Sequence, residues 1–335
     1  MQHALMCPQC NAPLKPSRFA RQVVCSYCGA TVQLDESAVP AEVFHAAFRA
    51  WNSPQSYTFA SWVSLGEAYW ALEAPLAIGE TADVFAGRRA RWPTELVIVK
   101  LLRERGAQER FENEWACLQE LQRSTARGAE TFAALLPQPV SHGELSAGLH
   151  AGRRASLFRW QAGFRHTFEA VRRAHPQGIP PRASIWVWRR ILEVLSFVHA
   201  SGLVHGAVLP PHLLVQDGEH GVRLVGYGRA GRAGGRLAAV SPACEDFYPD
   251  RPKAGLTLTP GLDVCMSARC VAAVLGGDPA AEALPEAVPA PLAALVRRVA
   301  RPERSEDAWE LRDELGVLAE RLYGAPQFIP IEMPS

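Results

Sequence analysis

Apolar residues recur every three to four positions in three stretches of the chain, which predicts three amphipathic helices. These stretches are PAEVFHAAFRAW at 40–51, RFENEWACLQEL at 110–121 and SIWVWRRILEVLSFVHA at 184–200. Short runs of alternating or β-branched residues at 23–24, 31–34 and 97–100 predict strands instead. The pattern therefore predicts a protein of the α+β class.

Four of the eight cysteines lie in the first 28 residues as two C-x2-C pairs, Cys7/Cys10 and Cys25/Cys28, with fourteen residues between the pairs. Each pair can present two thiolates on one tight turn, and two such turns form the tetrahedral sulfur cage that Zn2+ favours. The segment resembles a zinc ribbon. Because all four ligand positions are filled, the resemblance implies structural Zn2+ bound to a small β-hairpin module over residues 1–35.

Several functions are open to this module. It is either a cap on a larger domain, a redox pair, a nucleic-acid site using Lys15, Arg18 and Arg21, or a surface for protein contact. Two pairs at this spacing favour metal over redox chemistry. Aromatic residues for base stacking are few here, so we expect protein contact rather than nucleic-acid binding.

Composition narrows the protein class. Hydrophobic residues make up 48% and charged residues 21% of the 335-residue chain, which is ordinary for a globular protein with a sizeable core. A net charge of +1 gives no overall attraction to nucleic acid or anionic membranes. No apolar run reaches about 18 residues, and the start lacks the basic and apolar regions of a signal peptide. We therefore expect a cytoplasmic protein without membrane association.

From residue 61 to residue 323 the chain resembles a protein kinase, with its landmarks in the expected order. IGETADVFAG at 78–87 stands where the glycine-rich loop belongs, although only Gly79 precedes its valine–phenylalanine strand. VIVK ends in Lys100, and the following amphipathic helix carries Glu114. Lysine occurs only three times among 35 basic residues. Its presence at position 100 therefore favours a retained Lys100–Glu114 pair in a vestigial nucleotide site.

The approach to the catalytic loop is the most specific match. HASGLVH at 199–205 follows the long predicted helix, and VRLVGYG at 222–228 stands where a strand ending in Asp-Phe-Gly belongs. The resemblance implies that His205 and Tyr227 stack with Leu118 in a hydrophobic column. It also implies that Asp263, in a later helix, supports the catalytic-loop backbone.

The positions that carry chemistry in this family are altered. The catalytic Asp is replaced by Ala207, the metal-binding Asn by His212 and the Asp of Asp-Phe-Gly by Gly226. Phosphoryl transfer needs the first to orient the nucleophile and the other two to hold Mg2+. Gly206 replaces the neighbouring arginine, and RAGRAGGRLAAV at 229–240 has no hydroxyl to phosphorylate. The resemblance therefore implies a pseudokinase with no catalytic residue, in which ATP and Mg2+ are not expected.

We predict a zinc ribbon at 1–35, a connector at 36–60, a two-lobed protein kinase-like domain at 61–323 and an extended tail at 324–335. The lobes are expected at about 61–160 and 161–323. The predicted function is that of a catalytically inactive scaffold or regulator with protein partners in a signalling or macromolecular complex. The alternative is a divergent phosphotransferase or nucleotide-responsive switch, with Asp217, Glu245 or Asp246 replacing lost acids. The third reading is a nucleic-acid-associated protein using the ribbon and Arg229, Arg232 and Arg236.

The connector and the tail carry one further hypothesis. The connector helix has an apolar face, and prolines keep the tail GAPQFIPIEMPS from forming a helix. We expect the tail to run extended and to occupy a groove. Connector and tail together would hold the ribbon against the kinase-like domain.

Overall fold

The computed structural model describes residues 5–6, 13–14, 22–25, 31–33, 62–90, 95–216, 221–249, 255–301, 307–327 and 329–333. The chain forms two compact units. The first comprises Met1–Gln108 and Pro139–Trp160, and the second comprises Glu109–Gln138 and Gln161–Ser335. The helix that carries Glu114 therefore groups mainly with the second unit, and the predicted connector helix at 40–51 lies outside the described residues.

Four short strands lie near the amino terminus. Strand β1 (Leu5–Met6) pairs with β2 (Pro13–Leu14), and β3 (Gln22–Val24) pairs with β4 (Thr31–Gln33), both antiparallel. The second pair is the hairpin expected from the sequence, with Val23 opposite Val32. Each C-x2-C pair thus falls in or beside the segment that joins two paired strands.

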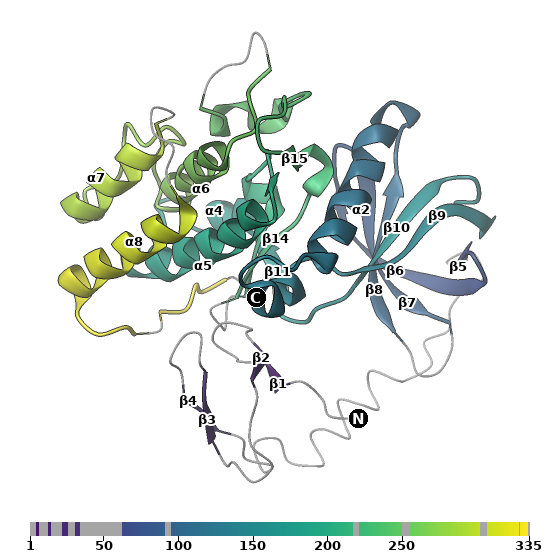
Figure 1. Cartoon of the computed structure of the whole chain (residues 1–335), viewed down its shortest axis with the longest axis horizontal. Helices are drawn as coiled ribbons and strands as arrows, with labels where there is room; N and C mark the ends of the chain where they lie inside the picture. The colour runs from purple at the N-terminus through teal and green to yellow at the C-terminus, as the bar shows by residue number, and fades with distance from the viewer. Residues whose placement is uncertain are drawn as a thin grey trace. The chain divides into compact units, whose positions relative to one another are not determined.

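Six antiparallel strands of the first unit form a closed barrel in the order β10-β8-β7-β6-β5-β9 (Figure 1). Their bounds are β5 Trp62–Leu65, β6 Ala68–Ile78, β7 Ala82–Arg89, β8 Leu96–Leu102, β9 Pro139–Gly148 and β10 Arg154–Arg159. The barrel closes because β5 pairs with β6 along one side and with β9 along the other.

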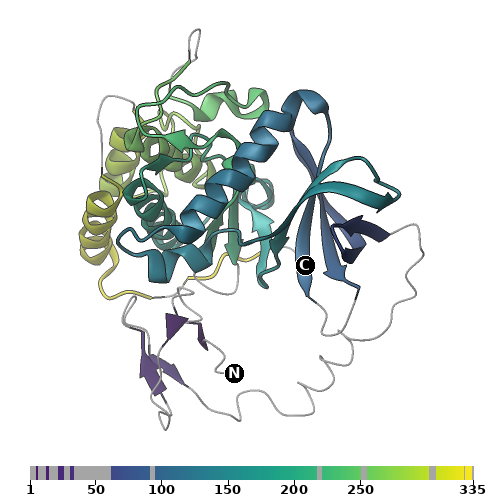
Figure 2. The same ribbon diagram turned by 45° about the vertical axis from the view of Figure 1, so that its right-hand side comes forward.

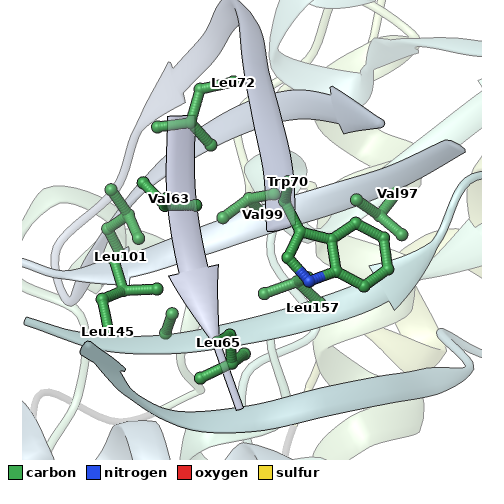
Figure 3. Packing of buried hydrophobic residues seen from close by; sticks show 10 residues of the cluster. Val63, Leu65, Trp70, Leu72, Val97, Val99, Leu101, Leu145 and Leu157 are labelled. Atoms are coloured by element: carbon green, nitrogen blue, oxygen red, sulfur yellow. The ribbon is translucent and has the colours of Figure 1, made fainter. Parts of the chain in front are cut away.

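The barrel interior is filled by alternate residues of its strands, as the two-residue period of a strand requires. On β8, Val97, Val99 and Leu101 are fully buried, whereas Lys100 between them points to the other face of the strand. Figure 3 shows these side chains in one cluster with aliphatic residues of the neighbouring strands, with Trp70 at one side and Leu101 beside Leu145 at the other. Burying one such aliphatic side chain contributes about 1.5–3 kcal/mol to the free energy of unfolding.

The second unit is mainly helical. Its longer helices are α2 Gln108–Arg123, α4 Phe168–Ala174, α5 Pro181–Ala200, α6 Pro260–Val274, α7 Ala290–Val299 and α8 Ala308–Tyr323. A small sheet has the order β11-β13-β14, with bounds Phe164–Thr167, Leu213–Gln216 and Val222–Leu224. Two further strands, β12 (Leu203–Val204) and β15 (Gly231–Arg232), pair with each other.

Helices α5 and α6 form the centre of this unit, and α5 also packs against α8 (Figures 1 and 2). The sequence sets where these helices begin. Pro181 and Pro260 lie in the first turns of α5 and α6, where a proline needs no hydrogen-bond partner. The hydroxyl of Thr259 accepts a hydrogen bond from the amide of Leu262, and the Asp307 carboxylate caps α8 in the same manner. Every residue from Leu262 to Val274 is buried.

Among the helices that the structure describes, none combines the length and the hydrophobicity needed to span a bilayer. The tail beyond Tyr323 has neither helix nor strand in its described residues. The expected extended course of the tail stays a prediction. Its predicted role in holding the ribbon stays a prediction, because most of residues 1–61 lie outside the described part of the chain.

Candidate functional site

The two residues predicted for the vestigial nucleotide site lie in different units. Lys100 stands at the centre of β8, opposite Val84 of β7 and Ser156 of β10, with its Nζ 5.9 Å from the centroid of the Phe158 ring. Glu114 lies on α2 and is only 5% exposed. The predicted pairing of Lys100 with Glu114 stays a prediction.

The counterpart of the glycine-rich loop is a tight turn between β6 and β7. The amide of Gly79 donates to the carbonyl of Ala82 at 2.9 Å, and the carbonyl of Gly79 accepts from the Arg103 guanidinium at 3.1 Å. Arg103 also lies 3.5 Å from the carboxylate of Asp83, which Arg153 contacts at 2.7 Å. A phosphate cradle requires backbone amides that point at the anion. Here the Gly79 amide is bound within the turn itself.

Asp263 of α6 fixes the chain that follows β12. One carboxylate oxygen accepts from the amide of His205 at 2.7 Å, and the other accepts from the amide of Gly206 at 2.8 Å. The His199 ring also contacts Asp263 at 3.0 Å. The predicted support of the catalytic-loop backbone by Asp263 is confirmed.

His205 and Tyr227 pack edge to face, with ring centroids 4.5 Å apart, and both side chains are fully buried. The carbonyl of Val225 accepts from Nε2 of His205, and Nδ1 accepts from the amide of Ala207. This pattern fixes a neutral imidazole, because Nδ1 is an acceptor. Burial lowers the pKa of His205 from 6.5 to about 4, although the nearby Asp263 carboxylate acts in the opposite direction.

Three altered positions are packed against one another. Nδ1 of His212 lies 2.8 Å from the carbonyl oxygen of Ala207, which fixes the ring. Gly226 has a φ of +82°, and a Cβ placed there would lie 2.6–2.8 Å from three atoms of the His212 ring. The imidazole therefore occupies the space that any side chain at position 226 would need.

Position 206 is restricted in a similar way. Gly206 has a φ of +67°, and a Cβ there would lie 2.7 Å from a methyl carbon of Leu258 and 2.9 Å from the carbonyl oxygen of Arg229. A side chain at this position would require its neighbours to shift.

The segment after β14 is held in place by side chains. The side-chain amide of Asn113 on α2 donates to the carbonyls of Gly228 at 3.1 Å and Ala230 at 2.8 Å. Arg229 donates to the carbonyls of Ala239 and Val240, and Arg232 forms an ion pair with Glu120 at 2.8 Å. Two arginines of the predicted nucleic-acid stripe are therefore engaged within this unit.

The remaining residues predicted from the sequence lie in several different segments of the chain. Glu245 and Asp246 are exposed on the short 3-10 segment Pro242–Phe247, whereas Asp217 lies outside the described residues. Cys25 is buried, but Cys7, Cys10 and Cys28 also lie outside them. Within the described ranges, no group of three or more His, Cys, Asp or Glu side chains is arranged to hold a metal ion. The zinc site and its four ligands stay a prediction.

Comparison with known proteins identifies the fold. No protein-family model matches the sequence, and no curated protein matches it. Among solved structures, a rhoptry kinase from Toxoplasma gondii matches with a TM-score of 0.55 and 16% sequence identity, covering 80% of this chain and 90% of that chain. Vaccinia related kinase 3 matches with a TM-score of 0.57 and 15% identity, covering 87% and 100%. The chain has a protein kinase-like fold.

A second structure from Toxoplasma gondii, the kinase domain of a specific rhoptry antigen, matches with a TM-score of 0.54, 16% identity and coverage of 84% and 93%. Identities this low establish the fold alone. Within the kinase-like fold, the barrel unit corresponds to the smaller lobe and the helical unit to the larger one. The sequence had indicated Asp263, His205 and Tyr227 but not Asn113, whose contacts join segments more than 100 positions apart.

Proposed function

We propose that this protein is a pseudokinase, a catalytically inactive kinase-like protein that acts as a binding scaffold or regulator. The observation that carries the proposal is the packing of His212 against Gly226. In a working kinase these two positions supply the oxygen ligands that hold Mg2+ near the phosphates. In this protein the ring of His212 fills the space that a side chain at position 226 would occupy.

The chemistry of the three positions supports the same proposal. Ala207 has no group that can orient or deprotonate a hydroxyl nucleophile. The His212 imidazole is a poor ligand for Mg2+, which prefers oxygen. Loss of a single acid–base group usually lowers a rate by about 10^2–10^4-fold. Loss of the metal ligands in addition would leave the charge on the phosphates without a counter-ion.

The segment from Gly228 to Val240 favours a constant binding surface over a switch. Asn113 anchors its beginning and Arg229 anchors its end, both through backbone carbonyls. Residues 229–240 contain no Ser, Thr or Tyr, so phosphorylation cannot order or release them. A segment held by these contacts suits a scaffold that presents a defined surface.

The amino-terminal module would supply a second binding surface. We propose that Cys7, Cys10, Cys25 and Cys28 bind one structural zinc ion, which would stabilise the paired strands β1–β2 and β3–β4. Strands of two or three residues bury too little surface to fold alone, and metal binding contributes about 10–16 kcal/mol in small zinc modules. A closed four-sulfur site would have no catalytic role.

Nucleotide binding and phosphate transfer test the proposal directly. We expect millimolar MgATP to leave the melting temperature of the purified protein unchanged. We also expect no incorporation of labelled γ-phosphate into the protein or into generic substrates. Incorporation that is abolished by Lys100→Ala would contradict the pseudokinase proposal.

One observation favours a second candidate, a nucleotide-responsive switch. Lys100 stands on β8 in a protein with only three lysines among its 35 basic residues. A lysine at this position could contact a phosphate without metal. A melting shift with ATP in the presence of EDTA, lost in Lys100→Ala, would support this candidate against the scaffold alone.

A further inference from the structure

The chain after α8 lies along the face of the helical unit formed by α4 and α5. It turns at Gly324 and continues without helix or strand through its described residues to position 333. Figures 1 and 2 show this segment in yellow, leaving α8 and running past α5. All of these elements belong to the second unit.

Side chains of α5 and of the residue after α4 bind backbone carbonyls of the tail. Arg182 donates to the carbonyls of Tyr323 at 3.4 Å and Ala325 at 3.1 Å, and to the side-chain oxygen of Gln327 at 2.9 Å. The indole N–H of Trp186 donates to the carbonyl of Ile329 at 3.0 Å. Nε2 of His175 lies 2.7 Å from the carbonyl oxygen of Glu332.

These contacts recognise an extended backbone more than a sequence. Carbonyl oxygens are present in every residue, so Arg182, Trp186 and His175 would bind them in any chain of the same conformation. Proline favours that conformation because its φ is fixed and it has no amide that needs a partner. The tail contains two prolines, Pro326 and Pro330, which favour this extended conformation.

One side chain of the tail, that of Ile331, contributes to recognition through its own burial. Ile331 is 2% exposed, whereas its neighbours Pro330 and Glu332 are both exposed. An aliphatic side chain in this place gains hydrophobic stabilisation that a polar one would not. The tail site therefore combines carbonyl recognition with the burial of one aliphatic side chain. Peptide-binding proteins use this combination for extended segments.

We propose that His175, Arg182 and Trp186 line a recognition groove for extended, proline-containing segments with an aliphatic residue, and that the tail is its internal occupant. A partner protein carrying a segment of the same chemistry would displace the tail and bind in its place. This inference rests on the proposed scaffold function and gives the chemistry of the partner. The donors lie on or beside helices, so the groove is already formed when the tail leaves.

Tethering gives the tail an advantage over a free peptide. A segment joined to its site by a short linker has an effective concentration of about millimolar, so a free peptide must exceed that level to compete. Weakening the tail within the intact chain should therefore reveal binding that the wild-type protein hides. Ile331→Asp is the appropriate change, because it places a charge where the Ile331 side chain is buried and leaves α4 and α5 unaltered.

The experiment uses a fluorescent peptide of residues 324–335 and measures its anisotropy with the full-length protein. We expect the Ile331→Asp protein to bind the peptide at least about tenfold more tightly than the wild type. Glu332→Ala, which changes an exposed neighbour, should behave like the wild type. A peptide carrying Ile331→Asp should not bind, and Trp186→Phe in the protein, which removes the indole donor, should weaken binding.

Equal peptide binding by the wild-type and Ile331→Asp proteins, or binding by neither, would overturn the proposal. If Ile331→Asp lowers the circular dichroism signal of the folded protein, a chain ending at Gly324 replaces it in the same assay. Concentration-dependent dimers of the wild type that are lost in Ile331→Asp would assign the groove to a second copy and overturn the partner-segment version. The assay involves no nucleotide, so its failure is separate from failure of the pseudokinase proposal.

Discussion

The His212 imidazole occupies the space beside Gly226 that a β-carbon would need. Its ring atoms lie 2.6–2.8 Å from the position of that carbon, and the ring is fixed by the carbonyl of Ala207. The His212 ring and a side chain at position 226 would therefore compete for the same space. A side chain introduced at position 226 would require the His212 ring to move.

We predict that Gly226→Ala destabilises the protein and that His212→Ala relieves part of the effect. A non-glycine residue in left-handed backbone costs about 1–3 kcal/mol, and the clash with the ring adds to that cost. Removing the ring leaves only the backbone strain. A double-mutant cycle in urea should therefore give a coupling energy of at least about 1 kcal/mol between the two positions.

Gly234 provides the matched control for this cycle. Its φ is +84°, but a Cβ there would meet no atom within 4 Å. Gly234→Ala should therefore report backbone strain alone and show no coupling to His212→Ala. If Gly226→Ala costs no more than Gly234→Ala, the imidazole does not block position 226.

Asn113 should be needed to hold the segment that begins at Gly228. Asn113→Ala removes two hydrogen bonds to backbone carbonyls, which should lower the free energy of unfolding by about 1–3 kcal/mol. Hydrogen exchange should accelerate in residues 228–232. Gln122→Ala is the control, because it removes a bond from the same helix to the carbonyl of Ala133. Exchange that accelerates equally in both variants would contradict the specific role of Asn113.

Stability should fall as the solution is acidified through the range where His205 stays neutral in the folded protein. Burial lowers the pKa of His205 from 6.5 to about 4. Between these two pH values the imidazole is therefore protonated in the unfolded chain and neutral in the folded protein. The contribution of His205 to the free energy of unfolding is constant above pH 6.5, decreases between pH 6.5 and about 4, and is constant again at lower pH. A shift of this size corresponds to about 3 kcal/mol.

The measurement compares urea unfolding of the wild type and His205→Gln across this pH range. Asp263, Glu114 and His212 also act on the pKa of His205, so the difference between the two proteins isolates the imidazole. The wild type should lose more stability on acidification than the variant. Parallel curves would show that the pKa of His205 is the same in the folded and the unfolded protein.

Zinc content tests the amino-terminal module. We expect one zinc ion per chain by elemental analysis of protein purified under reducing conditions, and its loss when Cys7 and Cys10 are both changed to Ser. Cys244→Ser is the control, because Cys244 lies in the second unit, apart from the four predicted ligands. Stoichiometric zinc in the doubly substituted protein would show that these thiolates are not required.

The sequence predicted those parts of the fold that depend on local pattern and on a specific motif. The apolar period of 184–200 gave the greater part of α5, and HASGLVH located the loop that Asp263 supports. Such features can be read because the residues that define them are close together in the sequence.

Contacts between distant segments were not predictable in the same way. Strand β5 closes the barrel through β9, which is more than 70 residues away. Nothing in the pattern at 62–65 indicates that partner. The sequence also showed that His212 and Gly226 had changed, but not that one fills the space of the other. That relationship depends on the left-handed backbone at Gly226, which a one-letter pattern does not encode.

Closure of the barrel has a consequence for how this unit can associate with other proteins. A sheet with an open edge offers a row of unpaired backbone groups that a strand from another chain can join. Each of the strands β5 to β10 has a neighbour on both sides, but β5 pairs only with Ala68–Ala71 of β6, so Leu72–Ile78 pairs with a strand on one side only. Where the backbone pairs on both sides, as at Trp70 and Ala71, a partner strand cannot be added. A partner that binds there must be held through side chains.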